Sequence, residues 1–522
     1  MLAVDLGTGG PKVALVSGRG AIVSHAKRPV TTTLLAGGGA EQDPAQWWEA
    51  VVGAAQEVLD HRAVPTESIV GVACTAQWSG TVATAADGSA LRPAVIWMDS
   101  RGSDAIRRQT GGPVSVLGYD VRKLQRWIRL TGGAPGHSGK DPTAHILWIK
   151  EAEPDVYGET HRFLEPVDWL TQRLTGRALA SYDSIVAHWV TDNRRIGAVH
   201  YDAKLLAMAG LERSKLPDLV PSASVAGTLT EQAAKELGLP SGLPVASGTG
   251  DVHSAAVGSG AAADFEAHLY IGTSSWISCH VPFKKTDALH NVASIPSAVP
   301  GRYLVADEHE TAGACLTFLA DTVLSGDDAL GSQAPPPDVY RRLDEVAETV
   351  EPGAGGTLFT PWLNGERSPV DDHTIRAGFH NLSLSTTRRQ LVRAVYEGVA
   401  FNSRWLLKAV ERFVGRQFSS LAFVGGGANS DVWAQVHADV TGRRIRQVAD
   451  PVLANVRGAG LLGFVALGAI DVSDISTAVD VCRTYEPDPS TAAVYDELYA
   501  EFVNLYKDTK AIHRRLNSRR GR

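Results

Sequence analysis

A glycine-rich turn directly behind an acidic residue, at the start of the chain, constrains the fold more than any other feature. The run is Asp5-Leu6-Gly7-Thr8-Gly9-Gly10-Pro11-Lys12, and the stretches 2–6 and 12–16 on either side are apolar and β-prone. The glycines therefore predict a β-hairpin whose backbone N–H groups can face a phosphate. The pattern is not a P-loop, because Lys12 is followed by a second strand and not by Ser or Thr.

Similar turns return in the middle of the chain. Gly248-Thr249-Gly250 leads into Asp251, and Gly272-Thr273-Ser274 lies between the strand-like stretches 267–271 and 276–280. Each of these turns is common when taken alone. Their repetition indicates an internal duplication, in which two hairpins hold one phosphate chain from opposite sides.

Length and composition set the broad class. A chain of 522 residues exceeds what one hydrophobic core supports, so at least two domains are expected. Hydrophobic residues make up 44% and charged residues 20%, as in ordinary soluble proteins, and the net charge of −7 argues against nucleic acid as a partner. No stretch approaches the roughly 18 apolar residues of a membrane span. The N-terminus enters a strand without a basic and apolar signal-like segment, so a cytoplasmic location is expected. The scattered, single cysteines predict reduced, buried thiols: Cys74, Cys279, Cys315 and Cys482.

Strand-like and helical segments alternate along both halves, which predicts α/β layers. Short strands are expected at 68–74 and 93–97, and a helix over 41–59 has Asp43 as its N-cap and Pro44 at its first position. In the second half, a long core-facing helix is expected over 390–414. A buried strand at 421–424 then ends in Gly425-Gly426-Gly427-Ala428, before a helix over 429–440 and a final amphipathic helix.

These turns match the needs of phosphoryl transfer. That reaction requires backbone donors around the phosphates, carboxylates that hold hydrated Mg²⁺ and an acceptor for the proton of the attacking hydroxyl. The two hairpin turns offer the donors, and the triple-glycine corner lets a flat base approach the backbone. Asp5 is the candidate carboxylate for the metal and Asp251 the candidate base. We expect an ordinary carboxyl pKa near ~3.9 for Asp251, which suffices when the hydroxyl loses its proton late.

Together, these segments resemble the FGGY carbohydrate kinases over nearly the whole chain, from residue 3 to about 506. The resemblance implies an α/β fold of two actin/hexokinase-like (ribonuclease H-like) domains that flank a deep cleft. It implies an N-terminal sugar-binding domain over 1–258, a C-terminal nucleotide-binding domain over 259–485, and a C-terminal helix with a basic tail over 486–522. Four further motifs carry the resemblance: Glu41-Gln42-Asp43-Pro44, Trp97-Met98-Asp99-Ser100-Arg101, Thr311-Ala312-Gly313-Ala314 and Pro361-Trp362-Leu363-Asn364-Gly365-Glu366-Arg367-Ser368-Pro369.

The resemblance also implies an activity and its residues. It implies an ATP-dependent kinase that phosphorylates a pentulose or related polyol with Mg·ATP as donor. Asp251 takes the proton of the acceptor hydroxyl, and Asp5 and Asp251 hold the metal through water. The oligomeric state is left open, a homodimer included. The implied acceptor-binding residues are Gln77, Trp78, Asp99, Arg101 and Asp251. The implied nucleotide-binding residues are Thr8, Gly9, Gly10, Lys12, Gly272, Thr273, Ser274, Gly313, Thr317, Gly426, Gly427, Ala428 and Asp431.

The sequence departs from the similar xylulokinases at two positions of the acceptor pocket. Those enzymes have Met-His-Gly behind a Gln, whereas this chain has Gln77-Trp78-Ser79-Gly80. A Trp offers an apolar face and one N–H donor and cannot accept a hydrogen bond as imidazole can. Xylulokinases also favour Asn after the base, where this chain has Val252 and His253, and we expect His253 to be a packed residue. The identity of the acceptor is therefore open.

Two other classes of function remain as alternatives. A non-catalytic ATP-binding clamp of the same fold would bind nucleotide without an acceptor. A nicotinamide dehydrogenase would use the corner at 425–427 for a dinucleotide and Asp450 for its ribose, although Ser430 stands where a third glycine or alanine belongs.

Overall fold

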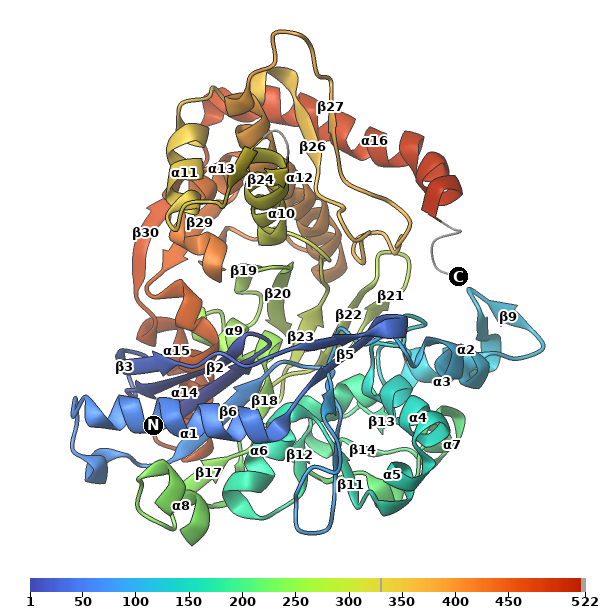
Figure 1. Ribbon diagram of the computed structural model, residues 1–522, viewed down its shortest axis with the longest axis vertical. Helices are drawn as coiled ribbons and strands as arrows, with labels where there is room; N and C mark the ends of the chain where they lie inside the picture. The colour runs from blue at the N-terminus through green and yellow to red at the C-terminus, as the bar shows by residue number, and fades with distance from the viewer. Residues whose placement is uncertain (329–330, 518–522) are drawn as a thin grey trace.

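Two large mixed β-sheets organise the molecule (Figure 1). The computed structural model describes residues 1–328 and 331–517. In the N-terminal sheet the order is β16-β17-β6-β1-β2-β3, with β18 also paired to β6. Its strands are β1 (Leu2–Gly7), β2 (Gly10–Val16), β3 (Ile22–Lys27), β6 (Val72–Ala76), β16 (Val225–Thr228), β17 (Pro244–Ala246) and β18 (Thr249–Gly250).

The C-terminal sheet has the order β21-β22-β23-β20-β19-β28-β29-β30. It occupies the second half of the chain, above the N-terminal sheet in the view of Figure 1. Its strands are β19 (Ala267–Ile271), β20 (Ser275–Val281), β21 (Thr286–Asp287), β22 (Val292–Pro296), β23 (Tyr303–Ala306), β28 (Ser420–Val424), β29 (Arg444–Val448) and β30 (Val481–Tyr485).

The two sheets share one local topology. β1 and β2 form an antiparallel hairpin in which Gly7 opposes Gly10, and β6 lies parallel to β1. In the same way, β19 and β20 form a hairpin in which Ile271 opposes Ser275, and β28 lies parallel to β19. Both hairpins were predicted from their glycines. The repeated topology is the duplication that the two turns indicated.

Side-chain caps mark the starts of two helices, and the first of these caps was predicted. In α1 (Pro44–Asp60) the Asp43 carboxylate accepts a hydrogen bond from the Ala45 N–H (2.9 Å), and the buried face, with Trp47 and Val51, packs on β2 and β3. The long helix α12 (Arg388–Val414) starts with a capping box between Thr387 and Gln390 and packs against α13 (Asp431–Thr441) and β20. α1 therefore packs on the N-terminal sheet, and α12 packs on the C-terminal sheet.

A helix crossing joins the two halves. α9 (Asp251–Gly258) packs against α14 (Ala454–Ala466), which lies between β29 and β30 of the C-terminal sheet in sequence yet also contacts β1 and β6 of the N-terminal sheet. A Cβ on Gly258 would lie 1.7 Å from the Ala454 carbonyl oxygen, and a Cβ on Gly458 would lie 1.9 Å from that of Ser254. Only glycine permits this approach. The helix that starts with Asp251 is therefore fixed at the junction of the two sheets.

Some expectations need correction. The strand expected over 68–74 is β6, shifted to Val72–Ala76, and the strand over 93–97 is only β8 (Ala94–Val95). Cys482 is exposed, whereas the other three cysteines are buried. The final helix α16 spans Ala492–Asn517 and so includes Arg514 and Arg515 of the expected basic tail. The other arginines of that tail, Arg519, Arg520 and Arg522, lie outside the described residues. Within residues 1–328 and 331–517, none of the helices combines the length and apolarity of a membrane span.

Candidate active site

The N-terminal sheet brings the two candidate carboxylates together. Asp5 of β1 lies in register with Thr75 of β6, and Thr249 of β18 lies in register with the same Thr75 on the other side. Asp251 follows β18 directly as the first residue of α9. The Thr75 hydroxyl donates to the Thr249 carbonyl (3.0 Å), which holds β18 at this place. Asp5 and Asp251, far apart in sequence, thus emerge from strands that flank one central strand.

The electrostatics of this pair are unequal. Asp5 is buried, and its Oδ2 accepts from Lys12 Nζ at 2.9 Å, whereas its Oδ1 is buried without a partner among the described residues. Burial, followed by the negative charge of Asp5, raises the pKa of Asp251 to about 7, although Lys12 opposes the shift. The expectation of an ordinary pKa for Asp251 was wrong. A sequence shows neither the burial of this side chain nor its charged neighbour.

The second hairpin faces the same carboxylates. Burial raises the pKa of Tyr270, near the end of β19, to about 12, and the charges of Lys12, Asp251 and Asp5 act on the Tyr270 hydroxyl. The Tyr270 ring stacks on Trp276 of β20, with 3.9 Å between the ring centroids. Residues of the C-terminal sheet therefore border the carboxylate pair. Tyr270 was not among the predicted site residues, although its place two residues before Gly272 was a signal in the sequence.

The turn between β19 and β20 is supported by the start of α10 (Gly313–Phe318). The Gly313 N–H donates to the Gly272 carbonyl and the Ala312 N–H to the Thr273 carbonyl, both at 2.8 Å. A Cβ on Gly313 would lie 2.4 Å from the Gly272 oxygen. The predicted residues Gly272, Thr273 and Gly313 therefore form one compact backbone unit.

The triple-glycine corner lies against the same hairpin. Gly425 has φ of 91°, and a Cβ there would lie 2.5 Å from the Ile271 carbonyl oxygen. A Cβ on Gly427 would lie 2.4 Å from the Ile271 side chain. At Gly426, by contrast, no atom lies within 4 Å of a Cβ position, and Gly9 of the first turn is open in the same way. The crowded glycines shape the corner, and the open ones leave backbone accessible to a ligand.

A cavity of about 720 Å³ lies between the two halves. It is lined by Lys12 of β2 together with Ala428 and Asp450 of the C-terminal half, and exposed Cys482 also lies on its wall. This volume is typical of a cofactor site.

Several predicted ligand residues have protein partners. The Thr8 hydroxyl donates to Gln77 Oε1 (3.1 Å) and accepts from Trp97 Nε1 (2.9 Å). Thr317 pairs with the Tyr340 hydroxyl at 2.9 Å. The Asp431 carboxylate accepts from the hydroxyl of Tyr485 (2.7 Å) and from Gln447 and Arg483. These side chains are thus already held by protein groups, and their predicted contact with a nucleotide stays a prediction.

Asp99 and Arg101 belong to a charged network in the N-terminal half. Asp99 is buried and accepts from the Ala40 N–H (2.8 Å) and from Arg101 Nε (2.9 Å). Arg101 also bonds Glu41 (2.5 Å), and its guanidinium lies 3.7 Å from the centre of the Trp148 ring. Both side chains are thus held by protein groups, and their predicted contact with an acceptor stays a prediction.

Trp78 and His253 form one edge of the site next to Asp251. Their rings meet edge to face, with 5.2 Å between the centroids, and a Cβ on Gly250 would touch both. The Trp78 N–H donates to the Ser184 carbonyl at 2.9 Å. His253 is buried, and its Nε2 bonds the Pro296 carbonyl of β22 at 3.0 Å. His253 is packed, as expected, and it ties α9 to the C-terminal sheet.

The carboxylate pair fits a hydrated Mg²⁺. Asp5 Oδ1 is a buried, unpartnered acceptor, and Asp251 is a second carboxylate beside it. Mg²⁺ prefers one or two carboxylates with several retained waters. Among the described residues there is no cluster of three or more His, Cys, Asp or Glu side chains that could enclose a metal. The donors present therefore suit coordination through water.

This geometry defines a class of protein. Two duplicated α/β halves, each with a glycine-rich hairpin that faces a shared carboxylate pair, are the framework of a phosphotransferase of the actin and hexokinase type.

Known proteins identify the family within this class. Models of the N-terminal and C-terminal domains of the FGGY family of carbohydrate kinases match residues 1–258 and 268–467. The xylulose kinase of Escherichia coli strain K12 is 27% identical over 97% of this chain and 98% of its own length. A gluconokinase of Bacillus licheniformis is 24% identical over 97% of this chain and 95% of its own length. The crystal structure of xylulose kinase from Rhodospirillum rubrum has a TM-score of 0.82 at 28% identity, covering 98% of this chain and 99% of that chain.

The chain therefore belongs to the FGGY family of carbohydrate kinases, as its motifs predicted. It is an ATP-dependent kinase of a sugar or polyol. These relatives give no support to the non-catalytic clamp or to the dehydrogenase. The corner at 425–427 that suggested a dinucleotide site lies in the matched C-terminal kinase domain.

Proposed function

We propose that this enzyme transfers the γ-phosphate of ATP to a hydroxyl of a pentulose or related polyol, with Asp251 as the general base. One observation carries this proposal: Asp251 stands at the start of α9 beside the Asp5 carboxylate, where burial and the charge of Asp5 raise its pKa to about 7. A base works best when its pKa lies near the operating pH. At neutral pH a large fraction of Asp251 is ionised and can accept the hydroxyl proton as the oxygen attacks phosphorus.

Asp5 and Lys12 prepare the site for the phosphates. The Lys12 ammonium neutralises Asp5 Oδ2, so that the two carboxylates can lie close together. The free Asp5 Oδ1 and Asp251 would hold Mg²⁺ through water, and the ion would supply positive charge at the β- and γ-phosphates. The open backbone at Gly9 and Gly426 would lie against the triphosphate and the base. Residues 1–258 and 259–485 would act as the sugar and nucleotide domains.

Trp78 sets the character of the acceptor pocket. The one N–H of the Trp78 ring already donates to the Ser184 carbonyl, and an indole has no hydrogen-bond acceptor. Trp78 therefore has no hydrogen bond to offer to the substrate. Its half-buried ring lies beside Gly250, directly before the base. We therefore favour an acceptor that presents a C–H face at this point over one that needs an imidazole partner there. A homodimer and a cytoplasmic location stay predictions.

The test is ADP release in a coupled assay across ketopentoses, pentitols, tetritols, glycerol, hexuloses and gluconate. The wild-type enzyme should respond to a pentulose or polyol, and Asp251→Asn should lower kcat by about 10²–10⁴-fold, the usual contribution of a general base. Asp43→Asn is the matched control, because it makes the same change at the start of α1, where Asn caps as well as Asp. Normal turnover by Asp251→Asn would refute the assignment of the base.

A further inference from the structure

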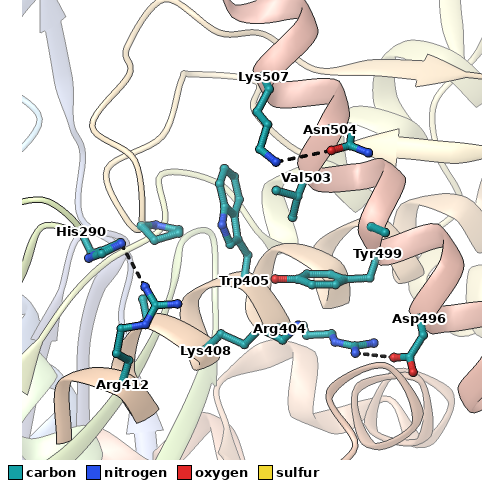
Figure 2. A pocket seen from close by; sticks show the side chains of 13 residues that line it. His290, Arg404, Trp405, Lys408, Arg412, Asp496, Tyr499, Val503, Asn504 and Lys507 are labelled. Carbon is teal, nitrogen blue, oxygen red and sulfur yellow. Dashed lines mark hydrogen bonds and ion pairs between the residues drawn. The ribbon is translucent and has the colours of Figure 1, made fainter. Parts of the chain in front are cut away.

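A basic groove lies in the C-terminal half, between α12 and α16 (Figure 2). Its volume is about 580 Å³, within the range of small-molecule sites. None of its lining residues is a candidate residue of the active site. The groove therefore needs an explanation of its own.

One face of α12 supplies most of the positive charge. Arg404, Lys408 and Arg412 are spaced four residues apart, so they lie in one row on the helix, and all three line the groove. Like charges at this spacing destabilise a helix. Lys507 of α16 and His290, before β22, line the groove from the facing side. A row of cations that repel one another is a cost that a bound anion would remove.

The carboxylates nearby neutralise only part of this charge. Arg404 pairs with Asp496 of α16. Arg412 instead donates to His290 Nε2 (3.3 Å), whose Nδ1 is held by Asp287 (2.7 Å).

Lys408 and Lys507 also have no carboxylate as an ion-pair partner among the described residues. The Lys507 ammonium donates a hydrogen bond to the Asn504 amide oxygen (3.4 Å). Lys408 lies over the Tyr499 ring at 4.1 Å, and partial burial, followed by the charge of Arg404, lowers its pKa. Lys408, Arg412 and Lys507 form no ion pair with a carboxylate in the part of the chain that the structure describes.

Aromatic side chains form the rest of the wall. Tyr499 lies under both Arg404 (4.4 Å) and Lys408 (4.1 Å), and Trp405 stands beside them in the groove. Cations held on a ring are oriented before a ligand arrives. The remaining apolar surface, including Val503, can contact the carbon skeleton of a ligand.

We propose that this groove binds a small phosphorylated metabolite, a phosphate monoester with a carbon body the size of a sugar. Lys408 and Arg412, one turn apart on α12, would meet the phosphate dianion, since charge-assisted N–H donors are the strongest partners of phosphate oxygens, and Lys507 adds positive charge at the other end of the groove. Trp405 and Val503 would contact the carbon body. A free sugar would bind poorly, because it leaves the cations unpaired.

The groove also lies on a helix that supports the nucleotide corner. The indole N–H of Trp433 donates to the Tyr396 carbonyl of α12 (3.1 Å). The same ring would lie 3.0 Å from a Cβ on Gly427. A ligand in the groove therefore contacts the same rigid helix that holds this corner from behind.

The test is calorimetric titration with inorganic phosphate, ribose 5-phosphate and glucose 6-phosphate, with glucose as the uncharged control. Saturating MgADP occupies the nucleotide part of the active site, and the variants below separate binding in the groove from binding in the acceptor pocket. The wild-type enzyme should bind the phosphate esters more tightly than inorganic phosphate and should not bind glucose. Lys408→Gln/Arg412→Gln should weaken binding at least tenfold, whereas Arg388→Gln/Arg389→Gln, the same charge change at the exposed start of α12, should leave it unchanged.

Three results would overturn the proposal. These are no binding by the wild-type enzyme at millimolar ester, equal binding by both double variants, or equal binding of glucose and its phosphate. A groove that is instead covered by a second copy of the chain would show itself differently: the Lys408→Gln/Arg412→Gln variant would change the oligomeric mass, and no ester would bind. Thermal unfolding of each variant verifies that the fold is retained.

Discussion

The two hairpins share their strand topology and differ in their chemistry. In the N-terminal hairpin Asp5 stands two residues before the glycine of the turn, and its ion pair with Lys12 crosses the hairpin. In the C-terminal hairpin the equivalent position is Tyr270, and it faces Trp276 across the strands as a stacked pair. The duplication therefore kept the turn, which can hold phosphates, in both halves. The carboxylate and its lysine partner occur at this place in the N-terminal hairpin only.

Of the changes that test this comparison, replacing the charged residue of the N-terminal hairpin by a neutral one should affect turnover most. Asp5→Asn should lower kcat on the order of 10²-fold, because it removes a carboxylate beside the phosphates and leaves Lys12 unpaired. Tyr270→Phe, at the equivalent position of the other hairpin, keeps the ring that stacks on Trp276 and should change kcat less than about threefold. Steady-state kinetics of both variants measures the difference. Equal losses would show that the halves share the chemistry.

A smaller effect is expected at the acceptor edge of the N-terminal half. Trp78→His should shift the ratio of kcat/KM between a ketopentose and its deoxy analogue by about 10–100-fold toward the ketopentose, because the imidazole restores a hydrogen-bond partner for a hydroxyl. Competition assays with paired substrates give this ratio directly. His253, on the far side of the Trp78 ring, should remain buried in the variant. An unchanged ratio would remove Trp78 from the acceptor pocket.

A change at the crossing of α9 and α14, which joins the two halves, should lower the free energy of unfolding. Gly458→Ala places a Cβ against the Ser254 carbonyl oxygen of α9, so α9 and α14 must move apart, at a cost of about 1–3 kcal/mol. Gly158→Ala is the matched control, because nothing lies within 4 Å of its Cβ position in the helix Pro154–Glu159, and alanine there should stabilise slightly. Urea unfolding of both variants measures the difference. Equal stability would contradict the close crossing.

The sequence predicted the backbone of the site better than its electrostatics. Glycine-rich turns between β-prone stretches determine hairpins locally, so both hairpins and the corner at 425–428 were found. Asp251 was proposed as the base from its glycine-rich turn, and the resemblance to FGGY kinases implied the same role. The raised pKa of Asp251, the use of the Trp78 N–H by Ser184 and the network around Asp99 depend on residues distant in sequence. Such contacts form only when the chain is folded, and a single sequence does not reveal them.

The pH dependence of kcat/KM, with both substrates below saturation, tests the central claim most directly, because it reports the ionisation of the free enzyme. If Asp251 is the base, kcat/KM should rise with pH and level off above about 7, since only the ionised carboxylate accepts a proton. In Asp5→Asn this bend should move to lower pH, because the neighbouring negative charge that raises the pKa is gone. A profile that is flat between pH 5 and 8 in the wild-type enzyme would contradict the account.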